Sequence, residues 1–391
     1  MKNPYDYFCS GCGLCKEFNG VSFEKDSSGF EYPAYLNDEQ ISFCDKYCYA
    51  GKNAISKKRK NIWGNYRSVY KGYSLDEKIR YSASSGGVLT AVAVYLLDRH
   101  RVDGIIQVRR DPSCPYKTVT VCSQTKEDIL SSCGSRYCQS EPLSGIMSLT
   151  QKNKKYAFIG KPCDAASLRN YLKDNNELNE RIEFIFSFFC AGVPSEKANL
   201  RLIKELGCEP DEVTLMDYRG NGWPGKAFVE DKSGQSYTME YEKSWMEILG
   251  RDIRNCCKFC FDGIGEAADV SCGDLWELTD QKKPDFSEKD GCNVVFSRTE
   301  KGQQLLEEMK SADQLFLDDY QDRIGELRYV QPNHYFKRST IFSKIFALKI
   351  TGRKAPKYKF SSLFSTVKYS SPRVLFGTFR GTVKRLKKGK I

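Results

Sequence analysis

Long and short apolar runs alternate along the middle of the chain. The run from Gly86 to Leu97 is predicted to form a buried helix, and the following run from Val102 to Val108, rich in β-branched residues, is predicted to form a strand. The helical run is too short to cross a bilayer and is followed at once by charged residues. This alternation indicates an α/β architecture, and we expect no segment that spans a membrane.

The same alternation returns later in the chain. A strand over residues 156–159, a loop, a helix over 164–173 and a second apolar strand over 182–189 form a predicted βαβ unit. This unit places Cys163 and Cys190 at the carboxyl ends of two strands. Because ligand sites of open parallel sheets gather at that edge, the two cysteines are expected to approach one another.

Composition divides the chain into four parts. Residues 1–55 are dense in cysteine and poor in apolar periodicity, which predicts a small ferredoxin-like module built around a metal centre. Residues 56–155 and 156–330 are together predicted to form a catalytic core of mixed α/β and α+β class. Residues 331–391 are basic and aromatic, and glycine and proline break them into short pieces, so we expect an appended basic tail.

The positive charge of the chain is concentrated in this tail. The formal net charge is +11, and residues 334–391 hold 16 Lys or Arg and no Asp or Glu, so subtracting these 16 leaves −5 for the first 333 residues. Phe, Leu, Ile and Val stand in patches beside the basic residues, a mixture that favours contact with an anionic membrane surface. We expect no binding to nucleic acid.

Cysteine is abundant, with 17 residues in the chain. The first residues show no basic start joined to an apolar run and a cleavage site, so we expect a cytoplasmic protein. Peripheral contact of the basic tail with the inner face of the membrane is our hypothesis, and a solvated, disordered tail is the alternative. Clustered thiols in that setting are typical of metal ligands or redox groups. The cysteines outside clusters are interpreted as small core residues: Cys114, Cys122, Cys133, Cys138, Cys208, Cys272 and Cys292.

The first cysteine motif lies at the start of the chain, where two residues separate each of Cys9, Cys12 and Cys15 from the next. This spacing lets one tight loop reach three corners of an iron–sulfur cube, whose fourth ligand in two-cluster ferredoxins comes from a distant motif. We assign Cys48 as that fourth ligand of a [4Fe–4S] cluster and keep Cys44 as the alternative. A zinc ion held by four thiolates is the competing interpretation.

The second cysteine motif is the pair Cys257 and Cys260. Together with Cys163 and Cys190 at neighbouring strand ends, the pair would complete the four thiolates of a second [4Fe–4S] cluster. Cys256 is the alternative to Cys257, and a plain core position is the alternative for Cys190.

A turn of small residues precedes the helix predicted from Val88. Small residues let backbone N–H groups at a helix N-terminus approach a phosphate, although such turns also cap helices that bind no ligand. The turn is formed by Ser84, Ser85, Gly86 and Gly87.

Short motifs recur in a distinctive order along residues 5–310 and carry a family resemblance. They are Ser84-Ser85-Gly86-Gly87-Val88-Leu89-Thr90, Val102-Asp103-Gly104, Gly134-Ser135-Arg136-Tyr137, Gly160-Lys161-Pro162-Cys163, Phe189-Cys190-Ala191-Gly192, Tyr218-Arg219-Gly220-Asn221-Gly222-Trp223, Cys257-Lys258-Phe259-Cys260-Phe261-Asp262 and Ala268-Asp269-Val270-Ser271-Cys272-Gly273-Asp274-Leu275-Trp276. In this order they resemble the beta-subunit family of coenzyme F420 hydrogenases and dehydrogenases, which are iron–sulfur flavoproteins with bacterial relatives in polysaccharide gene clusters.

The resemblance implies an N-terminal family domain over 56–155, a C-terminal family domain over 156–330, and FAD beside one or two [4Fe–4S] clusters. The implied partners are an electron carrier such as ferredoxin or coenzyme F420 and a small-molecule substrate. The candidate flavin contacts are Ser84, Ser85, Gly86, Gly87, Arg136, Lys161, Arg219 and Asp274.

Three functions are compatible with these residues. The first is an oxidoreductase that moves electrons between clusters and FAD and exchanges hydride with coenzyme F420 or another small substrate, for example in polysaccharide biosynthesis. The second is a non-catalytic electron-transfer subunit of a partner enzyme, and the third a zinc-stabilised interaction protein. No catalytic side chain is assigned.

Overall fold

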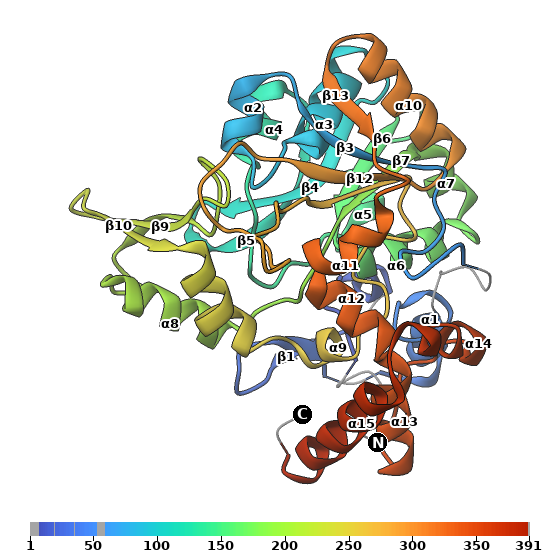
Figure 1. The fold of residues 1–391 in the computed structure, drawn as a ribbon. Coiled ribbons are helices and arrows are strands. Elements are labelled where there is room, and N and C mark those ends of the chain that lie inside the picture. The colour runs from blue at the N-terminus through green and yellow to red at the C-terminus, as the bar shows by residue number, and fades with distance from the viewer. Residues whose placement is uncertain (1–7, 19, 35, 53–58, 390–391) are drawn as a thin grey trace.

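The computed structural model describes residues 8–18, 20–34, 36–52 and 59–389. Within these ranges, eight strands form the largest sheet (Figure 1). They are β3 (Ser68–Ser74), β4 (Gly104–Asp111), β5 (Cys114–Ser123), β6 (Tyr156–Gly160), β7 (Ile182–Phe188), β11 (Val270–Asp274), β12 (Asn293–Ser297) and β13 (Leu315–Asp319). The order across the sheet is β13-β3-β12-β11-β7-β6-β4-β5.

The centre of this sheet is parallel, because β4, β6, β7 and β11 pair parallel to one another in that order. Helices cover both faces. Apolar residues of α3 (Val88–Asp98) and α10 (Glu300–Ser311) pack on one face, and those of α6 (Pro162–Leu172) and α7 (Asn176–Arg181) pack on the other. The mixed α/β architecture predicted from the alternation of apolar runs is confirmed.

The individual elements follow the predicted runs closely. The helix expected from Gly86 begins at Val88, because Gly87 has φ +75° and an added Cβ would meet the Ile79 carbonyl oxygen at 3.1 Å. The predicted βαβ unit is β6, α6 and β7. Pro162 opens α6, where a missing N–H costs no helical hydrogen bond.

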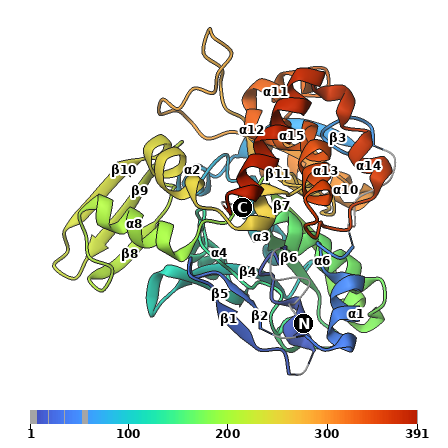
Figure 2. The same cartoon turned by 90° about the horizontal axis from the view of Figure 1, so that it is seen from below.

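A second sheet projects from one side of the molecule in both views (Figures 1 and 2). It contains β8 (Val213–Asp217), β9 (Lys226–Asp231) and β10 (Ser236–Glu240), paired antiparallel. Apolar residues of α8 (Glu196–Leu206) share its core. The connecting helices of the chain are α2 (Glu77–Ser82), α4 (Lys126–Ser131), α5 (Ile146–Leu149), η2 (Lys243–Ile248), η3 (Leu249–Arg251), α9 (Asn255–Lys258), η4 (Ile324–Glu326) and α11 (Leu327–Val330).

The described part of the N-terminal region is small. It contains η1 (Leu14–Glu17), the antiparallel hairpin of β1 (Phe23–Lys25) and β2 (Glu31–Pro33), and α1 (Asp38–Tyr47). A capping box of Asn37 and Gln40 starts α1. Leu14 and Tyr47 pack into the core formed by α6 and the large sheet, so this region is joined to the rest of the chain by apolar contacts.

Residues 332–389 form more regular helices than the short pieces that we expected. They form α12 (Pro332–Ser339), α13 (Ile341–Ile350), α14 (Phe360–Phe364), η5 (Val367–Tyr369) and α15 (Pro372–Lys387), gathered at one end of the molecule (Figure 1). Apolar side chains of α13, α14 and α15 share a core with Phe8, Leu36, Phe259 and Phe261. These helices therefore cover both cysteine-rich regions. Among the described residues, no helix is both long and apolar enough to cross a membrane.

Candidate functional site

The five cysteines of the N-terminal region lie together. Cys9 and Cys12 stand in the loop before η1, Cys15 lies in η1, Cys44 in the last turn of α1, and Cys48 caps that helix. All but Cys48 are buried. We call these five residues the first thiol group.

Electrostatics connects the members of the first thiol group. Burial raises the pKa of Cys9 to about 11, where Arg254 opposes the shift and the thiols of Cys48 and Cys15 add to it. Hydrogen bonding to the Cys44 thiol lowers the pKa of Cys15, and the same contact raises that of Cys44. The Gly11 N–H also donates to Cys9 Sγ at 3.3 Å.

The cysteines predicted to converge from distant segments are also brought together. Cys163 lies in the first turn of α6, Cys190 follows β7, Cys256 and Cys257 lie in α9, and Cys260 follows α9. Burial and the carboxylate of Asp164 raise the pKa of Cys163, and the thiols of Cys190 and Cys260 add to this shift. These five cysteines form the second thiol group.

Two hydrogen bonds distinguish Cys257 within the second thiol group. Its Sγ lies 3.8 Å from that of Cys256 and accepts the N–H of Val193 at 3.4 Å. The contact with Cys256 lowers the pKa of Cys257 to about 6. By contrast, burial raises the pKa of Cys190 to about 12 and that of Cys260 to about 11.

Arg254 lies between the two groups. Its Nε donates to the Cys9 carbonyl oxygen at 2.7 Å and its Nη1 to Gln139 Oε1 at 2.8 Å. Cys9 of the first group and Cys256 of the second both raise the pKa of this guanidinium, although burial opposes them. Its hydrogen bonds are to neutral acceptors, so the nearby thiols are the groups available to balance its charge.

In the part of the chain that the structure describes, no three His, Cys, Asp or Glu side chains converge to hold a single metal ion. Thiolates bind one zinc ion at about 2.3 Å, whereas a cluster of several irons and sulfides separates its ligands more widely. Buried thiols, N–H donors to sulfur and a buried cation are chemically suited to such an anionic cluster.

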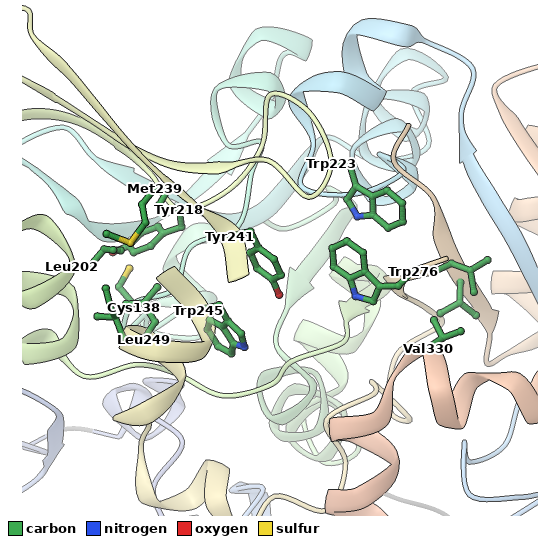
Figure 3. Packing of buried hydrophobic residues seen from close by; sticks show 14 of the residues in the cluster. Cys138, Leu202, Tyr218, Trp223, Met239, Tyr241, Trp245, Leu249, Trp276 and Val330 are labelled. Carbon is green, nitrogen blue, oxygen red and sulfur yellow. The ribbon is translucent and has the colours of Figure 1, made fainter. Parts of the chain in front are cut away.

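A cavity of about 320 Å³ opens at the carboxyl ends of β6, β7 and β11. This volume lies in the range of ligand clefts, roughly 300–1,000 Å³. Cys190 lines the cavity, so one member of the second thiol group forms part of its wall. Tyr241, Trp245 and Trp276, labelled in Figure 3, supply aromatic surface to the same wall, and the rings of Tyr241 and Trp276 lie 5.8 Å apart.

Seven of the eight predicted flavin contacts line this cavity: Ser84, Ser85, Gly87, Arg136, Lys161, Arg219 and Asp274. Gly86 does not line it. A Cβ at Gly86 would meet the Gly72 carbonyl oxygen at 2.8 Å, so this glycine serves close packing of the turn on the sheet.

The polar residues of the cavity are already paired with one another. Arg219 stands 2.7 Å from Asp274 and lies over the rings of Tyr241 and Trp276. Arg136 donates to the Met216 carbonyl oxygen at 2.8 Å. The Arg219–Asp274 pair therefore forms part of the cavity wall.

Lys161 and Asp164 link the cavity to both thiol groups. The two side chains form an ion pair of 2.8 Å, and Lys161 also donates to Ser140 Oγ at 2.7 Å. Burial opposes the charge on Lys161, but Asp164 and Cys163 raise its pKa. Burial raises the pKa of Cys12, and the Cys48 thiol and Asp164 add to this shift.

Several site residues were not predicted from the sequence. Tyr49 places its hydroxyl 3.7 Å from Cys260 Sγ, and its only sequence signal was its position after Cys48. His334 enters the cavity wall with Nδ1 3.0 Å from Gln331 Oε1, and burial lowers its pKa to about 3. Cys133, interpreted as a core residue, also lines the cavity. These residues become neighbours only through the fold.

Comparison with protein families gives two adjoining matches. Residues 69–147 match the model for the N-terminal part of the coenzyme F420 hydrogenase/dehydrogenase beta subunit. Residues 153–323 match the model for the C-terminal part of the same beta subunit. Both matches end before α12.

Curated relatives from methanogenic archaea are similar to this chain. The coenzyme F420 hydrogenase subunit beta of Methanococcus voltae is 24% identical over 69% of this chain and 90% of the relative. The F420-dependent formate dehydrogenase subunit beta of Methanocaldococcus jannaschii is 26% identical over 60% and 63%. The coenzyme F420-dependent sulfite reductase of the same organism is 27% identical over 84% of this chain but only 50% of the relative.

A solved structure shares the fold. A chain of the F420-reducing [NiFe] hydrogenase complex from Methanosarcina barkeri superposes with a TM-score of 0.59 at 21% identity. The match covers 76% of this chain and 98% of that chain. The architecture of the cavity-bearing core is thus a known one.

Proposed function

We propose that this chain, which belongs to the coenzyme F420 hydrogenase/dehydrogenase beta-subunit family, is an oxidoreductase that moves electrons between two [4Fe–4S] clusters and FAD. The observation that carries the proposal is the position of Cys190, which belongs to the second thiol group and also lines the cavity. FAD, when bound, supplies hydride exchange with a substrate and single-electron exchange with a cluster.

The residues of the chain divide between three tasks in this proposal. Cys9, Cys12, Cys15 and Cys48 hold one cluster, with Cys44 as the alternative ligand. Cys163, Cys190, Cys257 and Cys260 hold the other, with Cys256 as the alternative. The turn before α3, together with Lys161 and Arg136, contacts the flavin, while Arg219 and Asp274 fix the cavity wall and Gly86 fixes the turn. The boundaries near residues 55, 155 and 330 remain our proposed domain division.

Substrate and partners follow from the relatives in this proposal. Relatives are named for coenzyme F420, so we propose hydride exchange with this deazaflavin or another small substrate, and ferredoxin or coenzyme F420 as the electron carrier. We include polysaccharide biosynthesis as a process in which such a small substrate could be reduced. Because several relatives are named as subunits, the second candidate is an electron-transfer subunit of a partner enzyme.

Anaerobic purification of the full chain tests the proposal. We expect about eight iron and eight sulfide per chain, the content of two [4Fe–4S] clusters, together with one FAD. A protein that contains zinc and neither iron nor flavin would contradict it and favour a zinc-stabilised interaction protein. Substrate reduction by the purified chain alone separates the enzyme from the electron-transfer subunit.

The C-terminal helices offer a surface for an anionic membrane. Large apolar side chains are exposed on them, including Phe360 (64%), Phe376 (60%) and Ile350 (59%). The segment that carries them holds basic residues and no acidic ones. We propose peripheral membrane contact through this surface because exposed apolar side chains beside basic ones suit the interface of an anionic bilayer.

Point variants test this contact better than truncation, since α13, α14 and α15 share a core with Phe8 and Phe259. Phe376→Asn and Phe360→Asn should each reduce sedimentation with anionic phosphatidylserine vesicles several-fold at low salt. Phe316→Asn, an exposed phenylalanine on β13, is the matched control. Equal sedimentation of all variants, or no sedimentation of the parent chain, would contradict the contact.

A further inference from the structure

Two lysines of the C-terminal helices reach the backbone of the second thiol group. Lys337 of α12 donates from Nζ to the carbonyl oxygen of Ala191, the residue after Cys190. Lys344 of α13 donates from Nζ to the carbonyl oxygen of Lys258 at 3.2 Å, directly after Cys257. Both ammonium groups are therefore fixed beside residues proposed to hold a cluster.

These two cations have no carboxylate to balance them. Among the residues that the structure describes, neither Lys337 nor Lys344 forms an ion pair with Asp or Glu. Burial lowers the pKa of Lys344 to about 8, and the charges of Lys337 and Arg385 add to the shift. A partly buried ammonium group without a counter-charge is costly, so an anion nearby would stabilise it.

The thiols are the acidic groups that face the lysines. Lys337 lowers the pKa of both Cys257 and Cys260, and Cys260 opposes the depression of the Lys344 pKa. Four thiolates around an iron–sulfur core would carry the negative charge that both lysines lack. The charge of these residues is therefore complementary to the cluster proposed for this position.

The same segment also covers the second thiol group. The Tyr358 hydroxyl donates to the Phe259 carbonyl oxygen at 3.2 Å. Its ring lies 5.9 Å from that of Tyr49, whose hydroxyl contacts Cys260 Sγ. Because aromatic cover reduces the access of water, charges beside the group are weakly screened and act more strongly.

We propose that Lys337 and Lys344 are positioning residues that raise the reduction potential of the cluster held by the second thiol group. The inference rests on the proposed function and concerns a segment outside both family matches, the later of which ends at residue 323. Reduction adds one electron to the cluster, and a fixed cation stabilises this added charge. The C-terminal helices thus contribute to the redox site as well as to the surface proposed for membrane contact.

Redox titration of the anaerobically purified full chain, with dithionite as reductant and electron paramagnetic resonance as readout, tests this proposal. Lys344→Met and Lys337→Met should each change the reduction equilibrium of the second cluster about tenfold, which lowers its midpoint potential by about 59 mV for one electron. The cluster of the first thiol group should keep its potential, and the iron and sulfide contents should stay those of the parent chain.

Two further variants separate charge from structure. Lys344→Arg keeps the cation and should restore most of the potential, and Lys349→Met removes an exposed cation from the same helix and should leave the potential unchanged. Unchanged midpoints in both lysine-to-methionine variants with full iron content would overturn the inference while leaving the proposed function intact. A parent chain without iron and sulfide would overturn both.

Discussion

The two thiol groups contain the same number of cysteines but are built in different ways. The first draws its five cysteines from 40 consecutive residues, Cys9 to Cys48, in η1, the loop before it, and the end of α1. The second draws them from Cys163, Cys190 and the α9 region, which the parallel sheet brings to one edge. Local spacing therefore encodes the first group, and the fold of the core encodes the second.

Removing one ligand from each group gives the largest expected effect. Cys12→Ala and Cys163→Ala should each lose about half of the iron and sulfide, because each proposed cluster needs four thiolates. Only Cys163→Ala should also interrupt electron exchange between the remaining cluster and the flavin, because its group contains the cavity residue Cys190. Metal analysis measures the loss of iron and sulfide, and stopped-flow reduction of the flavin measures electron exchange. Equal flavin kinetics in the two variants would contradict the proposal that only the second thiol group lies next to the flavin.

The spare cysteine in each group gives the next largest effect. Cys48→Ala and Cys257→Ala should lose a cluster, whereas Cys44→Ala and Cys256→Ala should retain most of their iron. The reason is that Cys48 and Cys257 complete the proposed ligand sets, whereas the Cys256 thiol is a hydrogen-bond partner of Cys257 at 3.8 Å. Iron and sulfide analysis of the four variants identifies the ligands. The reverse pattern would show that Cys44 and Cys256 are the ligands in place of Cys48 and Cys257.

Replacement of Arg254, which lies between the two thiol groups, should destabilise the folded protein. Arg254→Met removes hydrogen bonds to the carbonyl oxygens of Cys9 and Glu31 and to Gln139, which keeps the Glu31 N–H as its other donor. We expect the free energy of unfolding to fall by about 3 kcal/mol, at roughly 1–3 kcal/mol for each lost bond. Arg251→Met, at an exposed neighbouring position, should change it by less than about 0.5 kcal/mol. Denaturant unfolding of the anaerobic protein measures both, and equal values would contradict the bridging role.

A pair of glycine variants tests the fit of the first group against Arg254. Gly11 and Gly145 have φ values of +75° and +71°, so alanine costs each about 1–2 kcal/mol of backbone strain. Only at Gly11 would the added Cβ meet another group, Arg254 Nη1 at 2.8 Å, whereas Gly145 faces open space. Gly11→Ala should therefore destabilise the protein more than Gly145→Ala in the same unfolding measurement. Identical losses would mean that the loop moves freely away from Arg254.

The sequence predicted those parts of the site that local pattern encodes. The apolar runs predicted β4, β6, β7 and α3, and the strand ends suggested that Cys163 and Cys190 should meet. Arg254 could not be placed from its sequence, since it acts on Cys9 from 245 residues away. Lys337 and Lys344 could not be distinguished from the other basic residues of the tail, because a count of charges does not show whether an ammonium group points inward or into solvent.

The central claim is that two separate sets of thiols each hold an iron–sulfur cluster, with the second set beside the flavin cavity. Crystals grown without oxygen and measured at the iron absorption edge test it directly through anomalous scattering. The account predicts two iron peaks, one among Cys9, Cys12, Cys15 and Cys48 and one among Cys163, Cys190, Cys257 and Cys260. An iron peak at the first set alone, or zinc at either set, would contradict it.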